Sequence, residues 1–114
     1  MTNYKFGDIV IIAFPYTNLN NVVVRPAMVV MDNGDEDIIV AKITSQKRDL
    51  KSVIEIHNWK SKKLTRLSYV RLSKLATLNR RDIKNKISSL DDEDIVKAKN
   101  VLRDLLNIKC EGNK

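Results

Sequence analysis

The sequence predicts one mainly β-stranded domain that ends in a helix. The first observation is a series of short apolar runs rich in Ile and Val, which favour pleated strands, separated by residues typical of turns. The second is an apolar stripe at helical spacing, made of Ile95, Ala98, Leu102, Leu105 and Leu106. The third is a length of 114 residues with no internal repeat or linker, which fits a single domain spanning 1–114.

Six strands are expected in chain order, at residues 9–14, 24–31, 37–44, 52–56, 67–72 and 74–78. Pro15 ends the first strand and begins a loop that contains Tyr16. Pro26 has no backbone N–H to donate, so we expect it at the first residue of its strand or on a sheet edge. The acidic residues 32–37 predict a turn, which is favoured over a cation site because they lack the spacing of a calcium-binding loop.

Two helices are expected after the last strand. Residues 79–82 resemble a capping box, in which Asp82 reaches back to the start of a short helix that runs to about Ile87. Acidic and capping residues at 89–94 then open the final helix. We expect its apolar stripe to dock on the sheet while its other face stays charged.

Basic charge is concentrated in the middle of the chain. The formal charge is +7, yet residues 42–86 alone hold fourteen basic and three acidic residues, a net charge of +11. The segments on either side are slightly acidic. This distribution fits a solvated surface or a footprint for a polyanion, and its concentration favours a polyanion, either nucleic acid or an acidic protein.

Several function classes are poorly supported by the composition. The single cysteine, Cys110, excludes an internal disulfide, and with no signal peptide we expect a chain of the reducing cytoplasm. No apolar run approaches the ~18 residues of a membrane helix. One His and one Cys make a poor metal-ligand set, and three glycines leave no glycine-rich phosphate loop. We therefore expect neither a metal ion nor a cofactor.

Arg25 and the residues around Thr44 are the best candidates for chemistry. Arg25 precedes Pro26, which favours extended backbone, so rigid strand geometry aims its guanidinium. It either pairs with a carboxylate inside the protein or grips an external anion. The hydroxyls of Thr44 and Ser45 and the amide of Gln46 follow the third strand, where such groups either cap a turn or hydrogen-bond a phosphate.

Three aromatic residues have two interpretations each. Tyr16 either packs at the base of its loop or covers a ligand. Trp59 lies among lysines, where it either stacks on a base or covers one end of the sheet. His57 is the only histidine and is more typical of a surface or turn residue than of a catalyst.

A repertoire of Arg, Lys, Thr and Ser suits one anionic substrate, a phosphodiester. RNA supplies its own nucleophile, the 2′-hydroxyl, so a protein that orients the phosphate and stabilises its charge needs no metal. An arginine grips two phosphate oxygens at once, as lysine does not.

The chain resembles the MazF/PemK toxins of bacterial toxin–antitoxin pairs. The resemblance covers residues 6–108 and is carried by blocks in a fixed order, at 7–10 with 14–17, 25–30, 41–45, and 68–72 with 74–78. It implies an SH3-like β-barrel (MazF/Kid/CcdB-like) with a C-terminal helix. It also implies a homodimer, and a metal-independent, sequence-specific endoribonuclease (mRNA interferase). Such an enzyme cuts single-stranded RNA at short sequences and leaves a 2′,3′-cyclic phosphate and a 5′-hydroxyl.

The family's arginine before proline falls on Arg25, and its hydroxyl after the third strand falls on Thr44. By this resemblance Arg25 stabilises transition-state charge, since an arginine side chain is a reluctant acid, and Thr44 fixes the scissile phosphate. The remaining residues expected to bind substrate are Ser45, Gln46, Tyr16, Lys42, Trp59 and Arg71. An acidic antitoxin is the expected protein partner, with operator DNA bound through their complex.

The chain departs from the family pattern at several positions. Residues 15–24 hold no histidine, Ser73 stands where some relatives carry an acid, and Ala76 stands where many carry arginine. The general base is therefore unassigned, and a degenerate toxin that only binds antitoxin and operator DNA is one alternative. The other alternative is a gyrase poison, against which the polar end at residues 110–114 counts.

Overall fold

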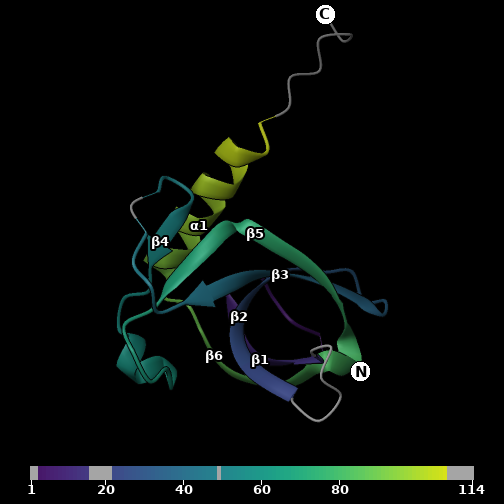
Figure 1. Cartoon of the computed structure of the whole chain (residues 1–114). Helices are drawn as coiled ribbons and strands as arrows, with labels where there is room; N and C mark the ends of the chain where they lie inside the picture. Colours follow the sequence, from purple (N-terminus) through teal and green to yellow (C-terminus); the bar gives the residue numbers. More distant parts are fainter. Residues whose placement is uncertain (1–2, 16–21, 49, 108–114) are drawn as a thin grey trace, which may run out of the picture.

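The computed structural model describes residues 3–15, 22–48 and 50–107 and shows a curved antiparallel sheet with one α-helix (Figure 1). The elements, in chain order, are β1 (Asp8–Pro15), β2 (Val22–Asp32), β3 (Asp37–Thr44), β4 (Val53–Glu55), the 3₁₀ helix η1 (Trp59–Lys62), β5 (Tyr69–Asn79), the 3₁₀ helix η2 (Arg80–Asp82), β6 (Ile83–Ser89) and α1 (Asp92–Leu105). None of the described helices combines the length and apolar character that a membrane crossing requires.

The six strands form one sheet in the order β4-β5-β3-β2-β1-β6. Figure 1 shows this sheet curling round, so that its two ends approach each other. No backbone ladder joins β4 to β6 among the described strands, so the barrel expected from the resemblance is an open one. The β-rich fold with a C-terminal helix is otherwise as the sequence predicts.

Pro26 lies inside a central strand rather than at the start of one. It faces Ile11 of β1, but the ladder from β2 to β3 begins only at the pair Ala27 and Lys42. At Pro26 the strand therefore has β1 as its only paired neighbour, and its second side is locally an edge. The missing N–H is tolerated for the reason that the sequence suggested, although the strand as a whole is not an edge strand.

The two separate strands expected at 67–72 and 74–78 are one continuous strand, β5. The register between β3 and β5 shifts at Ala41 and Lys42, whose partners are Leu75 and Arg71. This irregularity lets β5 bend, which is the usual effect of a bulge, without ending the strand. The polar residues Ser73 and Lys74 mark that bend and not a break.

The short helix expected from 79 to 87 is wrong. Only Arg80–Asp82 are helical, as η2, and the side chain of Asn79, not of Asp82, caps it by accepting a hydrogen bond from the N–H of Arg81 at 3.0 Å. Residues Ile83–Ser89 form β6, which pairs with β1. The strand forms in spite of the local capping signal, because pairing with β1 satisfies the backbone hydrogen-bonding groups of residues 83–89 and buries Ile83.

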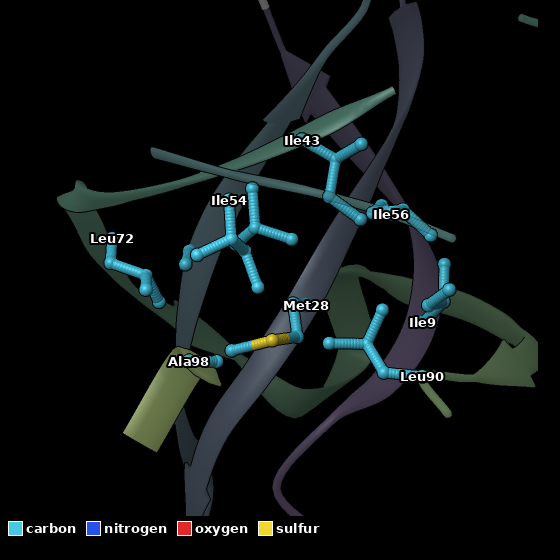
Figure 2. Close-up of a cluster of buried hydrophobic side chains, with 10 residues drawn as sticks. Ile9, Met28, Ile43, Ile54, Ile56, Leu72, Leu90 and Ala98 are labelled. Atoms are coloured by element: carbon cyan, nitrogen blue, oxygen red, sulfur yellow. The ribbon is translucent and has the colours of Figure 1, made fainter. Parts of the chain in front are cut away.

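The sheet buries apolar side chains on both of its faces. One cluster includes Met28, Ile56 and Leu72 of the sheet side together with Ala98 of α1, and Figure 2 shows the Met28 side chain reaching toward Ala98. The other cluster contains no residue of α1 and lies on the opposite face of the central strands, which we call the concave face; its members are Val10, Ile12, Ala27, Val29, Ile38, Val40 and Ile83. Within α1, Ile95, Ala98 and Val101 contact the core, whereas Leu105 and Leu106 of the expected stripe are exposed.

A buried ion pair joins the turn of the β2–β3 hairpin to η2. The carboxylate of Asp32, whose side chain is 1% exposed, receives two hydrogen bonds from the guanidinium of Arg80, one of them from Nη1 to Oδ2 at 3.0 Å. Asp32 also accepts from the N–H groups of Tyr4 and Gly34, each at 2.8 Å. These bonds lower the pKa of Asp32 far below its usual range, with the hydrogen bond from Arg80 as the largest cause.

Candidate functional site

Arg25, Lys42 and Thr44 lie on the concave face of the sheet. Ala27 pairs with Lys42 across β2 and β3, and cross-strand partners share a face. Because side chains alternate along a strand, Arg25 and Thr44, each two residues away, point to that same face. Continuing the register brings them to facing positions at the open end of the hairpin.

The first of two adjoining cavities on this face is polar and has a volume of about 390 Å³. Arg25, Lys42, Thr44, Ser45 and Gln46 line one side of it. The opposite wall comes from the segment before β5, at Leu64, Thr65, Arg66 and Ser68. The structure therefore brings five of the eight site residues named from the sequence to one cavity.

The second cavity, of about 440 Å³, is mainly apolar. Its apolar lining is made of Ile12, Ala27, Val40, Leu75 and Ala76. Its polar side chains are those of Arg25, Lys42 and Lys74. Arg25, Pro26, Lys42 and Ile43 line both cavities, so the two form one groove with cations at its centre. We call this the cationic groove.

The cations of the cationic groove have no negatively charged partner in the described part of the chain. The ion pairs found there involve other basic residues, namely His57, Lys62, Arg80, Lys86 and Arg103. Arg25, Lys42, Arg66 and Lys74 are exposed. Of the two roles open to Arg25 in the sequence, this geometry excludes an internal ion pair with any described residue and leaves the external anion.

The other predicted site residues do not line the groove. Arg71 faces Lys42 from β5 and is half-buried, with its Nε buried and without a hydrogen-bond partner among the described residues. Trp59 is half-buried against the core cluster, and the Nζ of Lys60 lies 5.6 Å from its ring centroid. Tyr16 lies outside the described residues.

Sequence reasoning missed the wall made by Leu64, Thr65, Arg66 and Ser68. The available signal was a basic stretch that also carries hydroxyls. What it lacked was the sheet order, because the pairing of β3 with β5 brings this segment beside the end of β3. Among the described residues, no group of three or more His, Cys, Asp or Glu side chains is arranged to hold a metal ion.

This wall is held in place through α1. The fully buried carboxylate of Asp94 accepts hydrogen bonds from the backbone N–H and from Nδ1 of His57, each at 2.8 Å. Asp91 accepts from Asn58 at 2.7 Å and from Lys62 at 2.6 Å. The bond from Lys62, followed by that from Asn58, lowers the pKa of Asp91. These contacts clamp residues 57–62 to the start of α1, directly before the wall begins.

His57 makes the clamp dependent on pH. The hydrogen bond to Asp94 is the largest cause that raises the pKa of His57 above its ordinary value of 6.5. A raised pKa in the folded state contributes stability below pH 6.5, and that stability is lost as pH rises through the folded-state pKa. We expect the melting temperature to fall over this range in the wild type, measured by circular dichroism.

His57→Asn is the matched variant, and it should lack this step because no other histidine exists in the chain. The Glu55 carboxylate, 3.9 Å from the Nε2 of His57, adds to the raised pKa, and Lys97 opposes it. An identical pH dependence in His57→Asn would refute the role given to His57.

Comparison with protein families identifies the chain over almost its entire length. The model of the PemK-like, MazF-like toxins of type II toxin–antitoxin systems matches residues 5–106. No curated protein matches the chain in sequence.

Solved structures share the fold at low sequence identity. An endoribonuclease in complex with its cognate antitoxin from a mycobacterial species superposes with a TM-score of 0.77 at 15% identity, covering 94% of this chain and 98% of that one. The Mycobacterium tuberculosis toxin MazF-mt6 has a TM-score of 0.74 at 16% identity, with 90% and 98% covered. A MazE–MazF structure from Deinococcus radiodurans gives 0.75 at 16%, with 93% and 98% covered.

Proposed function

Because the chain belongs to the PemK-like, MazF-like toxins of type II toxin–antitoxin systems, we propose that it is an endoribonuclease that cleaves single-stranded RNA without a metal ion. The observation that carries this proposal is the cationic groove, in which Arg25 and Thr44 line one cavity with cations that have no counter-charge among the described residues. Endoribonuclease is also the name given to structures with this fold.

In the proposed reaction the RNA attacks itself. The 2′-oxygen forms a bond to phosphorus as its proton is lost, and the bond from phosphorus to the 5′-oxygen breaks. The 5′-oxygen then takes up a proton, which leaves a 2′,3′-cyclic phosphate and a 5′-hydroxyl. Negative charge on the phosphoryl oxygens peaks between these events. A preorganised guanidinium aimed at those oxygens lowers the barrier, and this is the role that we give Arg25.

Thr44 and its neighbours position the phosphate. The hydroxyl oxygen of Thr44 accepts a hydrogen bond from the backbone N–H of Gln46 at 3.1 Å, which occupies one lone pair and leaves its own O–H group unused. That O–H is then free to donate to a phosphate oxygen. Ser45 and the Gln46 amide are exposed beside it. No carboxylate or imidazole lines the groove among the described residues, so the proposal assigns no general base.

Most of the affinity for RNA should come from phosphates. Lys42 and Arg66 face the groove on opposite sides of the polar cavity and neutralise neighbouring phosphates as counterions leave the RNA. Bases of unpaired RNA are accessible to side chains in a way that a duplex does not permit, which supports a single-stranded substrate.

The partners expected from the sequence follow from the same groove. We propose an acidic antitoxin whose disordered segment folds across these cations, which have no other anionic partner in the described ranges. An antitoxin is present in the related structures from mycobacteria and Deinococcus radiodurans. The homodimer and the binding of operator DNA through an antitoxin complex stay predictions.

The direct test is cleavage of an unstructured RNA by purified protein in excess chelator. We expect full activity, and we expect cleavage to stop when the nucleotide before the cut carries 2′-deoxyribose, because the attacking group is then missing. The product ends are identified by mass spectrometry. Cleavage that requires an added divalent cation, or that tolerates the deoxy substitution, would contradict the proposed chemistry, and RNA binding without cleavage would favour a non-catalytic toxin.

A further inference from the structure

The two halves of the cationic groove differ in what they can recognise. The polar half offers hydroxyls and an amide, groups that both donate and accept hydrogen bonds. The apolar half offers a hydrocarbon floor at Ile12, Ala27, Val40 and Ala76, and three cations around it. Arg25 and Lys42 belong to both halves, so a phosphate held by them lies directly beside the apolar cavity.

Lys74 belongs to the apolar half alone. Val40 pairs with Ala76 across β3 and β5, so Ala76 and Lys74, two residues apart on β5, share the concave face with Lys42. The side chain of Lys74 has no ion pair or hydrogen bond within the described residues, and the residue is exposed. Its ammonium is therefore available to a ligand that enters this cavity.

The side-chain hydrogen-bonding groups of this cavity are all donors. Lysine and arginine have no acceptor when charged. Guanine presents two acceptors, O6 and N7, and the O4 position of uracil is likewise an acceptor. Adenine shares the N7 acceptor but places the N6 amino donor where guanine has O6, and cytosine places the N4 amino donor where uracil has O4. A rim of hydrogen-bond donors therefore favours guanine and uracil, whose O6 or O4 accepts a hydrogen bond. Adenine or cytosine would instead place an amino donor against a cation, and no hydrogen bond would form between them.

We propose that the apolar half of the groove is a nucleobase site selective for guanine or uracil, with Lys74 as the residue that determines this specificity. The base lies against the floor of Ile12, Val40 and Ala76, and its keto oxygen accepts a hydrogen bond from Lys74. This inference rests on the proposed function for the phosphate beside it. It assigns the base next to the phosphate that Arg25 and Lys42 hold.

The positive charge of the lining side chains favours a nucleotide as the ligand of the apolar cavity. The cavity has three cations and no carboxylate among its described lining residues, and its volume of about 440 Å³ lies in the range of small-ligand pockets. A base attached to a phosphodiester supplies a flat apolar face, a keto oxygen and an anion at fixed spacing. Each of these matches one part of the cavity.

The test uses binding, so that it does not depend on catalysis. Four 2′-O-methylated decamers are made of cytidine with one central A, C, G or U, and their dissociation constants are measured by fluorescence anisotropy. We expect the G and U decamers to bind roughly tenfold more tightly than the A and C decamers. Lys74→Gln should abolish the difference, because an amide both donates and accepts.

Lys84→Gln is the matched control, since Lys84 is exposed on β6 and does not line the groove. It removes the same charge and should keep the base preference. Equal binding of all four decamers, a preference that survives Lys74→Gln, or no binding at all would each overturn the proposal. RNA cleavage by a protein with no base preference would remove only this inference, whereas a preference without cleavage would remove only the proposed reaction.

Discussion

Arg25→Ala should reduce the rate of RNA cleavage at saturating substrate by roughly 10²–10³-fold, the usual cost of removing one preorganised donor to a developing oxyanion. The guanidinium lines both cavities of the cationic groove and has no ion pair in the described chain. Its loss therefore removes charge stabilisation without depriving any described carboxylate of a partner. Cleavage of a fluorescently labelled RNA, followed over time, measures the effect. The melting temperature should hardly change, because Arg25 is exposed.

Two variants separate this role from a general effect of charge. Arg25→Lys keeps the charge but not the two-point grip, so we expect an intermediate rate. Arg81→Ala removes an exposed arginine of η2 that does not line the groove, and it should cleave as the wild type does. Equal losses in Arg25→Ala and Arg81→Ala, or full activity in Arg25→Ala, would remove the mechanism assigned here.

Asp32→Asn should lower the melting temperature by roughly 10 °C, the largest loss of stability that we expect from a change of one side-chain atom. The substitution preserves volume but puts an amide NH2 in place of one carboxylate oxygen, so it keeps the acceptor of only one N–H group, either that of Tyr4 at Oδ2 or that of Gly34 at Oδ1. It leaves the Arg80 guanidinium, 15% exposed, without the carboxylate that it grips at two points. Thermal unfolding followed by circular dichroism measures the change, and the exposed neighbour Asp37→Asn is the control.

The same pair determines how the fold responds to acid. The pKa of Asp32 is lowered in the folded state by Arg80, so its contribution is complete above the unfolded value of about 4 and is lost as pH falls toward the folded value. We expect the melting temperature of the wild type to fall more steeply than that of Asp32→Asn between about pH 5 and pH 2. Parallel curves for the two proteins would show that this ion pair does not govern acid stability.

Secondary structure was predictable from the sequence where it depends on residues that are close together in the chain. The β-branched runs became β1, β2 and β3 because alternate apolar side chains need two faces to bury them, and the final helix began where acidic residues favour its N-terminus. The residues 79–87 were not predictable in this way. Asn79 does cap a short helix, as the local pattern predicts. The residues from Ile83 onward instead form hydrogen bonds with the free edge of β1, and this long-range pairing cannot be predicted from local sequence.

The sequence by itself determined β1 to β4, the last helix, the basic middle segment and the candidates Arg25 and Thr44, because residue type and spacing set backbone preference and charge. Only the tertiary structure decided which cations stand together. The order of β2, β3 and β5 gathers Arg25, Lys42, Arg66 and Lys74 around one groove and carries Arg80 away to Asp32, 48 residues distant in the chain. Sheet pairing joins residues that are remote in sequence, and pairing depends on what the whole chain can bury.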